Sequence, residues 1–386
     1  MIKDIDAYFE EHGLYDGAKL AAHCEANLVR MSRSARVPNL ALLHYSDRAV
    51  FERQWSPFAL SCRGLIVDLK HRRLAAVPFF KFFNLGESSA PSAAELQALG
   101  AFEATEKLDG SMGIAFHDAD SGRFLITTKG SFDSEHGEWA SGLFPDSLKD
   151  ASLLASHTVM FEIISGRFRI VVDYAAKGYA EGLYLLGVRE RATQRLFDRS
   201  ENEAFARKHG LKITRSFAFS SIEAAVDETK GLPHSEEGYV LRFAGDVMVK
   251  LKSPEYLRVH RFLSNLSEKS LLELLAKGQE KQILDHLPSI AEEYRDQVTA
   301  ALKRMHEEAA AFRAACAAHF AAAPKGDRKT FAQWAMTVPP KEYTGFLFKT
   351  LDGKPPSEAD VHQYFLNTGR YAPSEGAGFT KLQDES

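Results

Sequence analysis

The sequence predicts an α+β fold, in which a domain of antiparallel sheets is followed by an all-α domain. Short strand patterns bounded by turn residues recur up to about residue 255, without the alternating helices of βαβ units. After about Ser253 the strand patterns nearly vanish, and a long Ala-rich amphipathic stretch takes their place. We therefore expect an N-terminal domain over residues 1–255 and an α-helical domain over residues 256–386.

The strands of the first domain are expected where short apolar runs end at turn residues. Five of these runs are Gly64–Asp68, Gly113–Phe116, Phe124–Thr128, Leu183–Val188 and Tyr239–Phe243. A further run, residues 159–164, is apolar except for Glu162. A carboxylate in such a strand has to face solvent or find a partner, so Glu162 is either a solvated residue or part of a site.

The second domain is expected to consist of helices over residues 266–286 and 291–323. In the longer stretch, apolar residues three or four apart share one face: Tyr294, Val298, Leu302, Met305, Ala309, Phe312 and Cys316. Pro339 and Pro340 interrupt the helical pattern, and the polar tail from about residue 372 is expected to fray.

Composition excludes several classes of protein. The chain has 386 residues and a formal net charge of −4, so any contact with a nucleic acid has to come from a local basic patch. No apolar run approaches the roughly 18 residues of a membrane span, and the N-terminus lacks a signal-peptide core. The three cysteines form neither a disulfide pattern nor a zinc pair, which suits the cytoplasm.

Charged motifs follow one another through the first domain. They are Lys107 in a K-x-D-G segment, the isolated Glu162, Glu237 before a glycine, and the K-x-K pair Lys250 and Lys252. Each alone has an ordinary explanation, such as an exposed lysine, a solvated strand residue or a loop carboxylate. Their order along one chain favours a common site.

A nucleophilic lysine would explain this set of residues. Free lysine has a pKa of about 10.4, and nearby positive charge lowers it. Lys250 and Lys252 are two apart on a predicted strand, so both side chains point to one face and can hold a triphosphate opposite Lys107. Glu237 would face a hydrated Mg²⁺ or Mn²⁺, since hard cations prefer oxygen ligands.

The segment Asp109-Gly110 after Lys107 is expected to form a tight turn. Aspartate favours turns, and glycine permits positive φ. We expect this turn to lift Lys107 from the end of a strand into a pocket.

Together, these motifs resemble the active site of covalent nucleotidyltransferases. Three more segments are similar to ATP-dependent RNA ligases of the phage T4 RNA ligase 1 type. They are residues 59–65 with Arg63, residues 79–85 with Lys81 and Phe83, and residues 128–132 with Lys129. The alternatives are a surface arginine, a core strand with a snorkelling lysine, and a hairpin lysine.

Two tyrosines and one loop also bear on the resemblance. Tyr45 lies near the family's nucleotide-contacting tyrosine, and Tyr256 completes a K-x-K-S-x-x-Y segment, although a packing role is the alternative for both. Residues 166–174 resemble the family's R-I-V-x-x-Y continuation, while residues 165–168 depart from the expected loop.

The resemblance implies a reaction, a nucleotide and a substrate. Lys107 would take AMP from ATP, with Mg²⁺ or Mn²⁺, and pass it to an RNA 5′-phosphate for joining to a 3′-hydroxyl. Arg63, Lys81, Phe83, Lys129, Glu162, Lys250, Lys252 and Tyr45 would bind the nucleotide, and Glu237 the metal. The helical domain would select the RNA, with a nicked tRNA as one candidate.

Other readings of the sequence remain open. A DNA ligase or a GTP-using capping enzyme would use the same lysine chemistry, but these enzymes carry an OB-fold where this chain turns helical. A catalytically inactive RNA-binding module is a third possibility. The presence of Lys107, Glu162, Glu237, Lys250 and Lys252 argues against it, because binding alone does not require all five.

Overall fold

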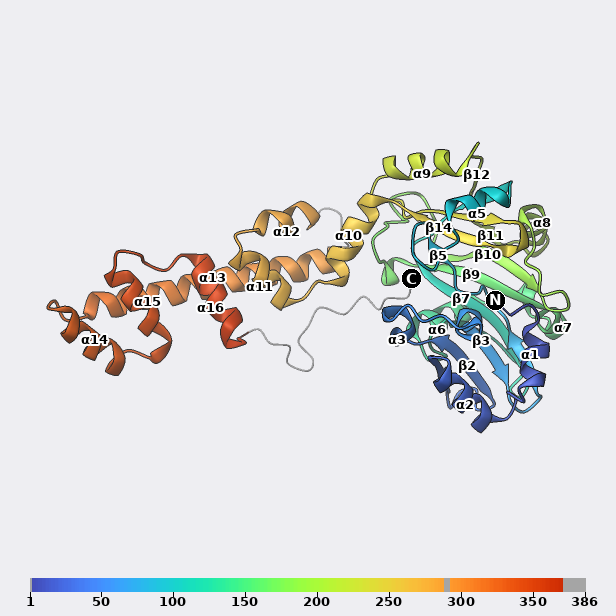
Figure 1. Cartoon of the computed structure of the whole chain (residues 1–386), viewed down its shortest axis with the longest axis horizontal. Helices are drawn as coiled ribbons and strands as arrows, with labels where there is room; N and C mark the ends of the chain where they lie inside the picture. Colours follow the sequence, from blue (N-terminus) through green and yellow to red (C-terminus); the bar gives the residue numbers. More distant parts are fainter. Residues whose placement is uncertain (1, 288–291, 371–386) are drawn as a thin grey trace. The chain divides into compact units, whose positions relative to one another are not determined.

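The computed structural model describes residues 2–287 and 292–370 (Figure 1). The chain divides into two compact units, the first ending at Arg258 and the second beginning at Val259. The first unit combines three sheets with short helices, and the second is helical. The α+β class with a helical C-terminal part is therefore confirmed.

The first sheet is four-stranded and antiparallel, in the order β1-β2-β3-β4. Its strands are β1 (Val29–Ser32), β2 (Leu40–Tyr45), β3 (Arg63–Asp68) and β4 (Arg73–Ala76). The helices of this segment are α1 (Ile5–Glu11), α2 (Gly17–Ala26), α3 (Asp47–Phe51) and α4 (Pro57–Ser61). Apolar residues of α1, α2 and α4 share one core cluster with residues of the sheet.

The second sheet has the order β11-β10-β9-β7-β8 and is antiparallel except at β10–β11. Its strands are β7 (Ser111–Asp118), β8 (Arg123–Thr128), β9 (His157–Ile164), β10 (Gly182–Glu190) and β11 (Lys212–Ile213). The helices of this region are α6 (Glu135–Gly142), α7 (Ala151–Ser156) and α8 (Arg199–His209), with short 3₁₀ turns at Asp146–Leu148 and Gly166–Phe168.

The third sheet has the order β12-β6-β13-β14-β5, and only β14–β5 is parallel. Its strands are β5 (Phe83–Asn84), β6 (Phe102–Glu106), β12 (Ser216–Phe217), β13 (Gly238–Phe243) and β14 (Met248–Lys252). Helices α5 (Ala93–Ala98) and α9 (Ile222–Gly231) contribute apolar residues to its core, and a 3₁₀ turn (Ala244–Asp246) joins β13 to β14.

The K-x-D-G segment is the crossing between the second and third sheets. It leaves β6 of the third sheet at Glu106 and enters β7 of the second sheet at Ser111. The register places Tyr239 of β13 opposite Glu106, and Glu162 of β9 opposite Met112 of β7. Motifs that are far apart in the sequence therefore lie close together where the chain passes from the third sheet to the second.

The second unit is built around the long helix α13 (Glu292–Ala322), and α10 (Pro254–Ser264) runs across the unit boundary. The other helices are α11 (Glu268–Ala276), α12 (Glu280–His286), α14 (Arg328–Thr337), α15 (Lys341–Leu351) and α16 (Glu358–Thr368). Helix α16 packs on α11 and α13. It begins at a Ser357 cap, whose Oγ accepts from the Asp360 backbone, and ends at Gly369 in the left-handed region.

Most predicted elements are confirmed, with differences at helix ends. All five expected strands are present, and the α13 face from Val298 to Cys316 is buried at the predicted apolar positions. The single stretch 266–286 is wrong in detail: it is two helices, because Gly278 adopts φ +66 between them. The Tyr294 side chain and the tail from residue 372 lie outside the described residues. No helix in the described parts has the length and apolarity of a membrane span.

Candidate active site

Lys107 and Glu237 form the centre of the candidate site. Lys107 follows the last residue of β6, and its backbone N–H donates to the Gly238 carbonyl at 2.9 Å. Its Nζ lies 2.7 Å from Oε1 of Glu237, a residue that immediately precedes β13 and is only 2% exposed. The pairing of β6 with β13 therefore brings the K-x-D-G and E-G motifs into direct contact.

Glu237 is shared between two lysines. Its Oε1 also lies 3.0 Å from Nζ of Lys252 at the end of β14. Burial would raise the pKa of Glu237, but the ammonium groups of Lys107 and Lys252 outweigh burial and hold that pKa below its usual value. Within the described residues, Oε2 of Glu237 has no hydrogen-bond partner. A buried carboxylate oxygen without a partner fits a hard divalent cation.

Three further cations, two of them buried, lie in this region. Lys250 is 6% exposed and Arg63 is 9% exposed, while Lys81 is half-buried. None of the carboxylates that the structure describes forms an ion pair with any of the three. Burial, together with the charges of Lys107 and Arg63, lowers the pKa of Lys250 well below its usual value. The fold therefore gathers positive charge that the described part of the protein does not neutralise.

The turn expected at Asp109-Gly110 is wrong in its mechanism. Gly110 is absent from the residues with positive φ. Glycine is needed there for close approach, because a Cβ would lie 2.4 Å from the Ile163 carbonyl and 2.9 Å from Ile164 Cδ1. This closeness lets the Gly110 N–H donate to Glu162 Oε1 at 3.0 Å.

Asp109 is a fully engaged, buried anchor rather than a turn residue. Its Oδ2 accepts from the backbone N–H groups of Val171 and Val172, both at 2.9 Å. Its Oδ1 accepts from the Tyr256 hydroxyl at 2.6 Å, at the start of α10. Burial and the nearby charge of Glu237 raise the pKa of Asp109 despite these bonds. Asp109 thus ties the Lys107 segment to two distant parts of the first unit.

Glu162 faces the same site from β9. Burial raises its pKa to about 7, although the positive charge of Lys107 opposes the shift. Within its apolar strand Glu162 is therefore the exception, and its side chain points to the partners named above rather than to solvent.

A cavity opens beside Lys107, Glu162 and Lys250, with about 630 Å³ of space including its mouth. That size suits a small-molecule ligand such as a nucleotide. Much of the remaining wall is aromatic or apolar and is formed by Phe79, Phe82, Leu108, Met112, Leu186, Val240 and Met248. Arg63 lies over the Phe82 ring at 5.3 Å and Lys250 lies over the same ring at 5.0 Å. The cavity thus joins an apolar wall to a cationic one.

Four of the remaining predicted residues, namely Lys81, Tyr45, Phe83 and Lys129, do not line this cavity. Lys81 lies within 5.5 Å of the ring centroids of Tyr45, Trp55 and Phe83, and burial lowers its pKa to about 8. Phe83 and Tyr45 belong to this aromatic group and do not line the cavity. Lys129 follows β8 and lies outside the cavity wall, where its Cα would be 3.0 Å from a Cβ on Gly64.

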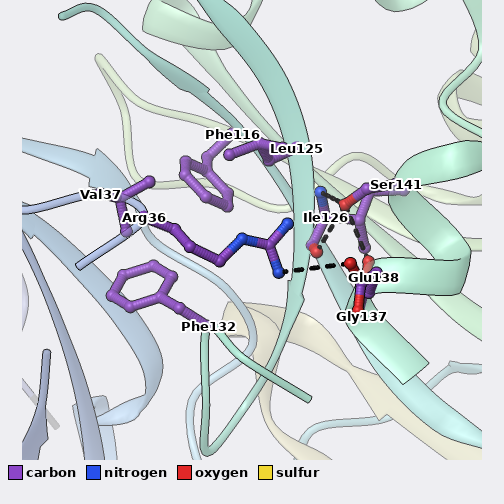
Figure 2. Close-up of a pocket in the computed structure, with 9 residues that line it drawn as sticks. All are labelled: Arg36, Val37, Phe116, Leu125, Ile126, Phe132, Gly137, Glu138 and Ser141. Carbon is purple, nitrogen blue, oxygen red and sulfur yellow. Dashed lines mark hydrogen bonds and ion pairs between the residues drawn. The ribbon is translucent and has the colours of Figure 1, made fainter. Parts of the chain in front are cut away.

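A second cavity lies away from these residues (Figure 2). Arg36, Phe116 and Phe132 project into it beside α6, and the Arg36 guanidinium lies 3.9 Å from Glu138. None of the predicted site residues lines it. Its only charged groups already face each other, so it has no unbalanced charge to offer a nucleotide.

Comparison with known proteins identifies the family of this chain. A model of the RNA ligase family matches residues 61–256, which are about half of the chain and include every strand from β3 to β14. The chain belongs to this RNA ligase family. The matched span includes Arg63, Lys107, Glu162, Glu237 and Lys250, which the structure brings together.

Individual relatives of this RNA ligase family member are distant. A candidate RNA ligase of Thermovibrio ammonificans is 30% identical over 243 residues, which cover 59% of this chain and 61% of that protein. A candidate bifunctional polynucleotide kinase/RNA ligase of Autographa californica nuclear polyhedrosis virus is 26% identical, covering 67% of this chain and 39% of that protein. The chain thus spans less than two thirds of the length of both relatives.

A solved structure, an archaeal ATP-dependent RNA ligase, is 17% identical. The alignment covers 79% of this chain and 82% of that one, with a TM-score of 0.49.

Two residues at or near the candidate site of this RNA ligase family member were not predicted from the sequence. Glu106, next to Lys107, lines the cavity with its carboxylate held by Arg215 at 2.8 Å and by the Tyr179 hydroxyl at 2.7 Å. Trp55 completes the aromatic group around Lys81. The adjacency of Glu106 to Lys107 was a usable signal, but nothing in the sequence linked Trp55 to residues 79–85.

Proposed function

We propose that this chain joins RNA ends at the expense of ATP, through a covalent lysine intermediate. In the first step, Lys107 Nζ attacks the α-phosphorus of ATP, a P–N bond forms, and pyrophosphate leaves. In the second, an oxygen of an RNA 5′-phosphate attacks the AMP phosphorus and releases Lys107. In the third, an RNA 3′-hydroxyl attacks the activated 5′-phosphate, and AMP leaves. Each step is a substitution at phosphorus, so positioning and charge supply most of the catalysis.

The observation that carries this proposal is the unneutralised positive charge beside Lys107. A buried cation without a counter-ion is costly, so proteins keep such groups where a ligand supplies the missing charge. Arg63, Lys81 and Lys250 lack carboxylate partners among the described residues, and Arg63 and Lys250 line the cavity that Lys107 enters. A triphosphate has the size and charge to complete this set, and the Phe79 and Phe82 wall suits a flat base.

The pairing of Lys107 with Glu237 sets the order of events. An ammonium held 2.7 Å from a carboxylate cannot attack phosphorus until it loses a proton. We infer that Glu237 holds Lys107 in place before ATP binds, and that the entering nucleotide loosens this pair. Mg²⁺ or Mn²⁺, held by Glu237 through its free Oε2, would offset charge on the phosphates.

Glu162 and Asp109 then keep the segment rigid. Glu162 accepts from the Gly110 N–H, and Asp109 fixes residues 171–172 and Tyr256. These bonds hold Lys107 between two fixed ends, which favours a single direction of attack.

We further propose that the helical unit selects the RNA, with a nicked tRNA as one candidate. All residues assigned to the nucleotide lie before Val259, where the helical unit begins. RNA recognition commonly depends on shape and on splayed single-stranded ends, and a separate helical unit could read either.

The proposal is tested with α-labelled ATP or GTP, a divalent metal and the full chain. We expect label on the protein from ATP and little from GTP, and then transfer of that label to 5′-phosphorylated RNA. Transfer to DNA in preference to RNA would make the chain a DNA ligase. A stronger GTP adduct would make it a capping-type enzyme, and no adduct with either nucleotide would overturn the covalent mechanism.

A further inference from the structure

We propose that the helical unit binds one divalent transition-metal ion, of the Zn²⁺ type, between α13 and α16 through His306, Glu358 and His362. This site is separate from the nucleotide chemistry, and its test does not depend on ligase activity.

The three side chains converge from two packed helices. His306 projects from the middle of α13, and Glu358 and His362 are four residues apart on α16, so they share one face of that helix. One ligand atom from each residue lies within 4.8 Å of the others. His306 Nδ1 is 2.5 Å from Glu358 Oε1, and His362 Nε2 is 4.0 Å from the same oxygen.

The environment of His362 distinguishes a metal site from an ordinary cluster of ion pairs. Its side chain is only 2% exposed, and its Nε2 has no hydrogen-bond partner within the described residues. A buried imidazole nitrogen that faces a carboxylate and a second imidazole without bonding either is poised as a ligand.

The surrounding contacts have the arrangement that metal-binding histidines usually show. Such histidines bind the ion through one ring nitrogen and donate from the other to a carboxylate or a backbone carbonyl. His306 can ligate through Nδ1, because its Nε2 lies 3.0 Å from Glu280 Oε1 at the start of α12. His362 can ligate through Nε2, because this nitrogen is buried and has no hydrogen-bond partner within the described residues.

The competing explanation is that His306 is simply a charged imidazolium between Glu280 and Glu358. That explanation accounts for both ring nitrogens of His306. It leaves Nε2 of His362 buried beside Glu358 and without a bond, which an ion at the centre of the three residues would correct.

The ligand set points to the class of ion. Two imidazoles and one carboxylate suit Zn²⁺ and its transition-metal neighbours, whereas Mg²⁺ prefers oxygen ligands alone. Ligand atoms around tetrahedral Zn²⁺ lie roughly 3.3 Å apart, since each bond is about 2.0–2.1 Å. The contacts of 2.5 and 4.0 Å bracket that spacing, so small side-chain rotations would form the site. A water would take the fourth position, and the ion would join α13 to α16.

The test is metal binding by the full chain without nucleotide. The protein is stripped with a chelator and desalted, and then titrated with Zn²⁺ by equilibrium dialysis, and with Co²⁺ by visible absorption. We expect one tight equivalent and the intense absorption of four-coordinate Co²⁺. Glu358→Gln, at a partly exposed position, and His306→Ala should each weaken binding about tenfold or more.

Two control variants separate this site from other metal contacts. His319→Ala removes another histidine of α13, and Glu237→Ala removes the carboxylate assigned to the nucleotide site. Both should bind Zn²⁺ like the wild type. His362→Ala serves as a third ligand variant if circular dichroism shows it to be folded. Absence of a tight equivalent in the wild type, or equal binding by Glu358→Gln and His306→Ala, would overturn the proposal.

Discussion

The two units of this protein differ in how the charged side chains named below are paired and buried. In the helical unit, charged side chains pair near the surface, as Arg328 does with Asp352 and Lys349 with Asp360. In the first unit, Arg63, Lys81 and Lys250 are buried or half-buried beside a cavity without a carboxylate partner among the described residues. Paired surface charge contributes little to stability, whereas unpaired buried charge costs stability and persists where a ligand needs it. The unpaired buried positive charge, more than the number of charges, distinguishes the candidate active site.

The largest effect is expected for Lys107→Ala. ATP-dependent joining of RNA should fall by about a thousandfold or more, because the nucleophile is lost. Joining of pre-adenylated RNA should persist, since that step does not use the lysine as a nucleophile. Both rates are measured with one 5′-labelled oligonucleotide, either phosphorylated or pre-adenylated. Equal loss of the two reactions would mean that Lys107 supports the fold of the site and not the first step.

Lys250→Met tests the comparison of charges directly. The variant should lose about a hundredfold in protein–AMP formation, because it removes a phosphate-binding cation. It should also raise the free energy of unfolding by about 1–2 kcal/mol, because it replaces a buried cation with an apolar side chain of similar length.

The matched control for Lys250 is Lys349→Met in the helical unit. Lys349 is 54% exposed and paired with Asp360, so this variant should have little effect on protein–AMP formation or on the free energy of unfolding. Single-turnover adenylylation and denaturant unfolding measure both variants. A Lys250→Met protein that is less stable than the wild type would contradict the idea that its charge is a cost to the fold.

The pH dependence of stability should carry the signature of Glu162. Its folded pKa of about 7 lies above the unfolded value, so the folded state binds more protons between about pH 4.5 and pH 7. This group therefore lowers the free energy of unfolding as pH rises through that window, by up to about 3 kcal/mol. Glu162→Gln keeps an acceptor for the Gly110 N–H and should remove that part of the slope.

Lys250 should contribute a slope of the opposite sign at higher pH. Its folded pKa is depressed, so the unfolded chain binds more protons below about pH 10.4, and stability should rise as pH approaches that value. Lys250→Met should lack this rise. Unfolding curves from pH 5 to about pH 10 compare both variants with the wild type, and unchanged slopes in both would mean that neither group is perturbed as described.

A smaller effect is expected for Tyr256→Phe. This change leaves Asp109 Oδ1 without its hydroxyl donor and should cost about 1–3 kcal/mol of stability. Tyr364→Phe in the helical unit is the control, since its hydroxyl makes no hydrogen bond within the described residues and little change is expected. Thermal unfolding measures both. Equal stability of the two variants would show that the Asp109–Tyr256 bond is not an anchor.

The fold and the types of residue at the candidate site could be predicted from the sequence. The contacts between residues that are distant in the sequence could not. Strands such as β9 and β13 were predictable because apolar runs and turn residues are local signals. The buried face of α13 was predictable for the same reason, since its apolar residues recur every three or four positions in the sequence. The break at Gly278 was missed because a single glycine inside a helical pattern is ambiguous.

The site shows where local signals end. Lys107, Glu162, Glu237 and the two lysines of β14 were found because they stand in ordered motifs. The role of Asp109 was missed because its partners lie about 60 and 147 residues away, at Val171 and Tyr256. The reason for Gly110 was wrong because a close approach to β9 depends on the meeting of two sheets. Contacts of that kind follow from the assembled fold and have no local pattern.

The central claim is that Lys107 is the residue that carries AMP. The most direct measurement incubates the full chain with ATP and a divalent metal, digests it at neutral pH to preserve the P–N bond, and maps the AMP-bearing peptide by mass spectrometry. The account predicts one modified site, at Lys107, that disappears in Lys107→Ala. AMP attached to Lys250 or Lys252 instead, or RNA joining without any adduct, would contradict the account.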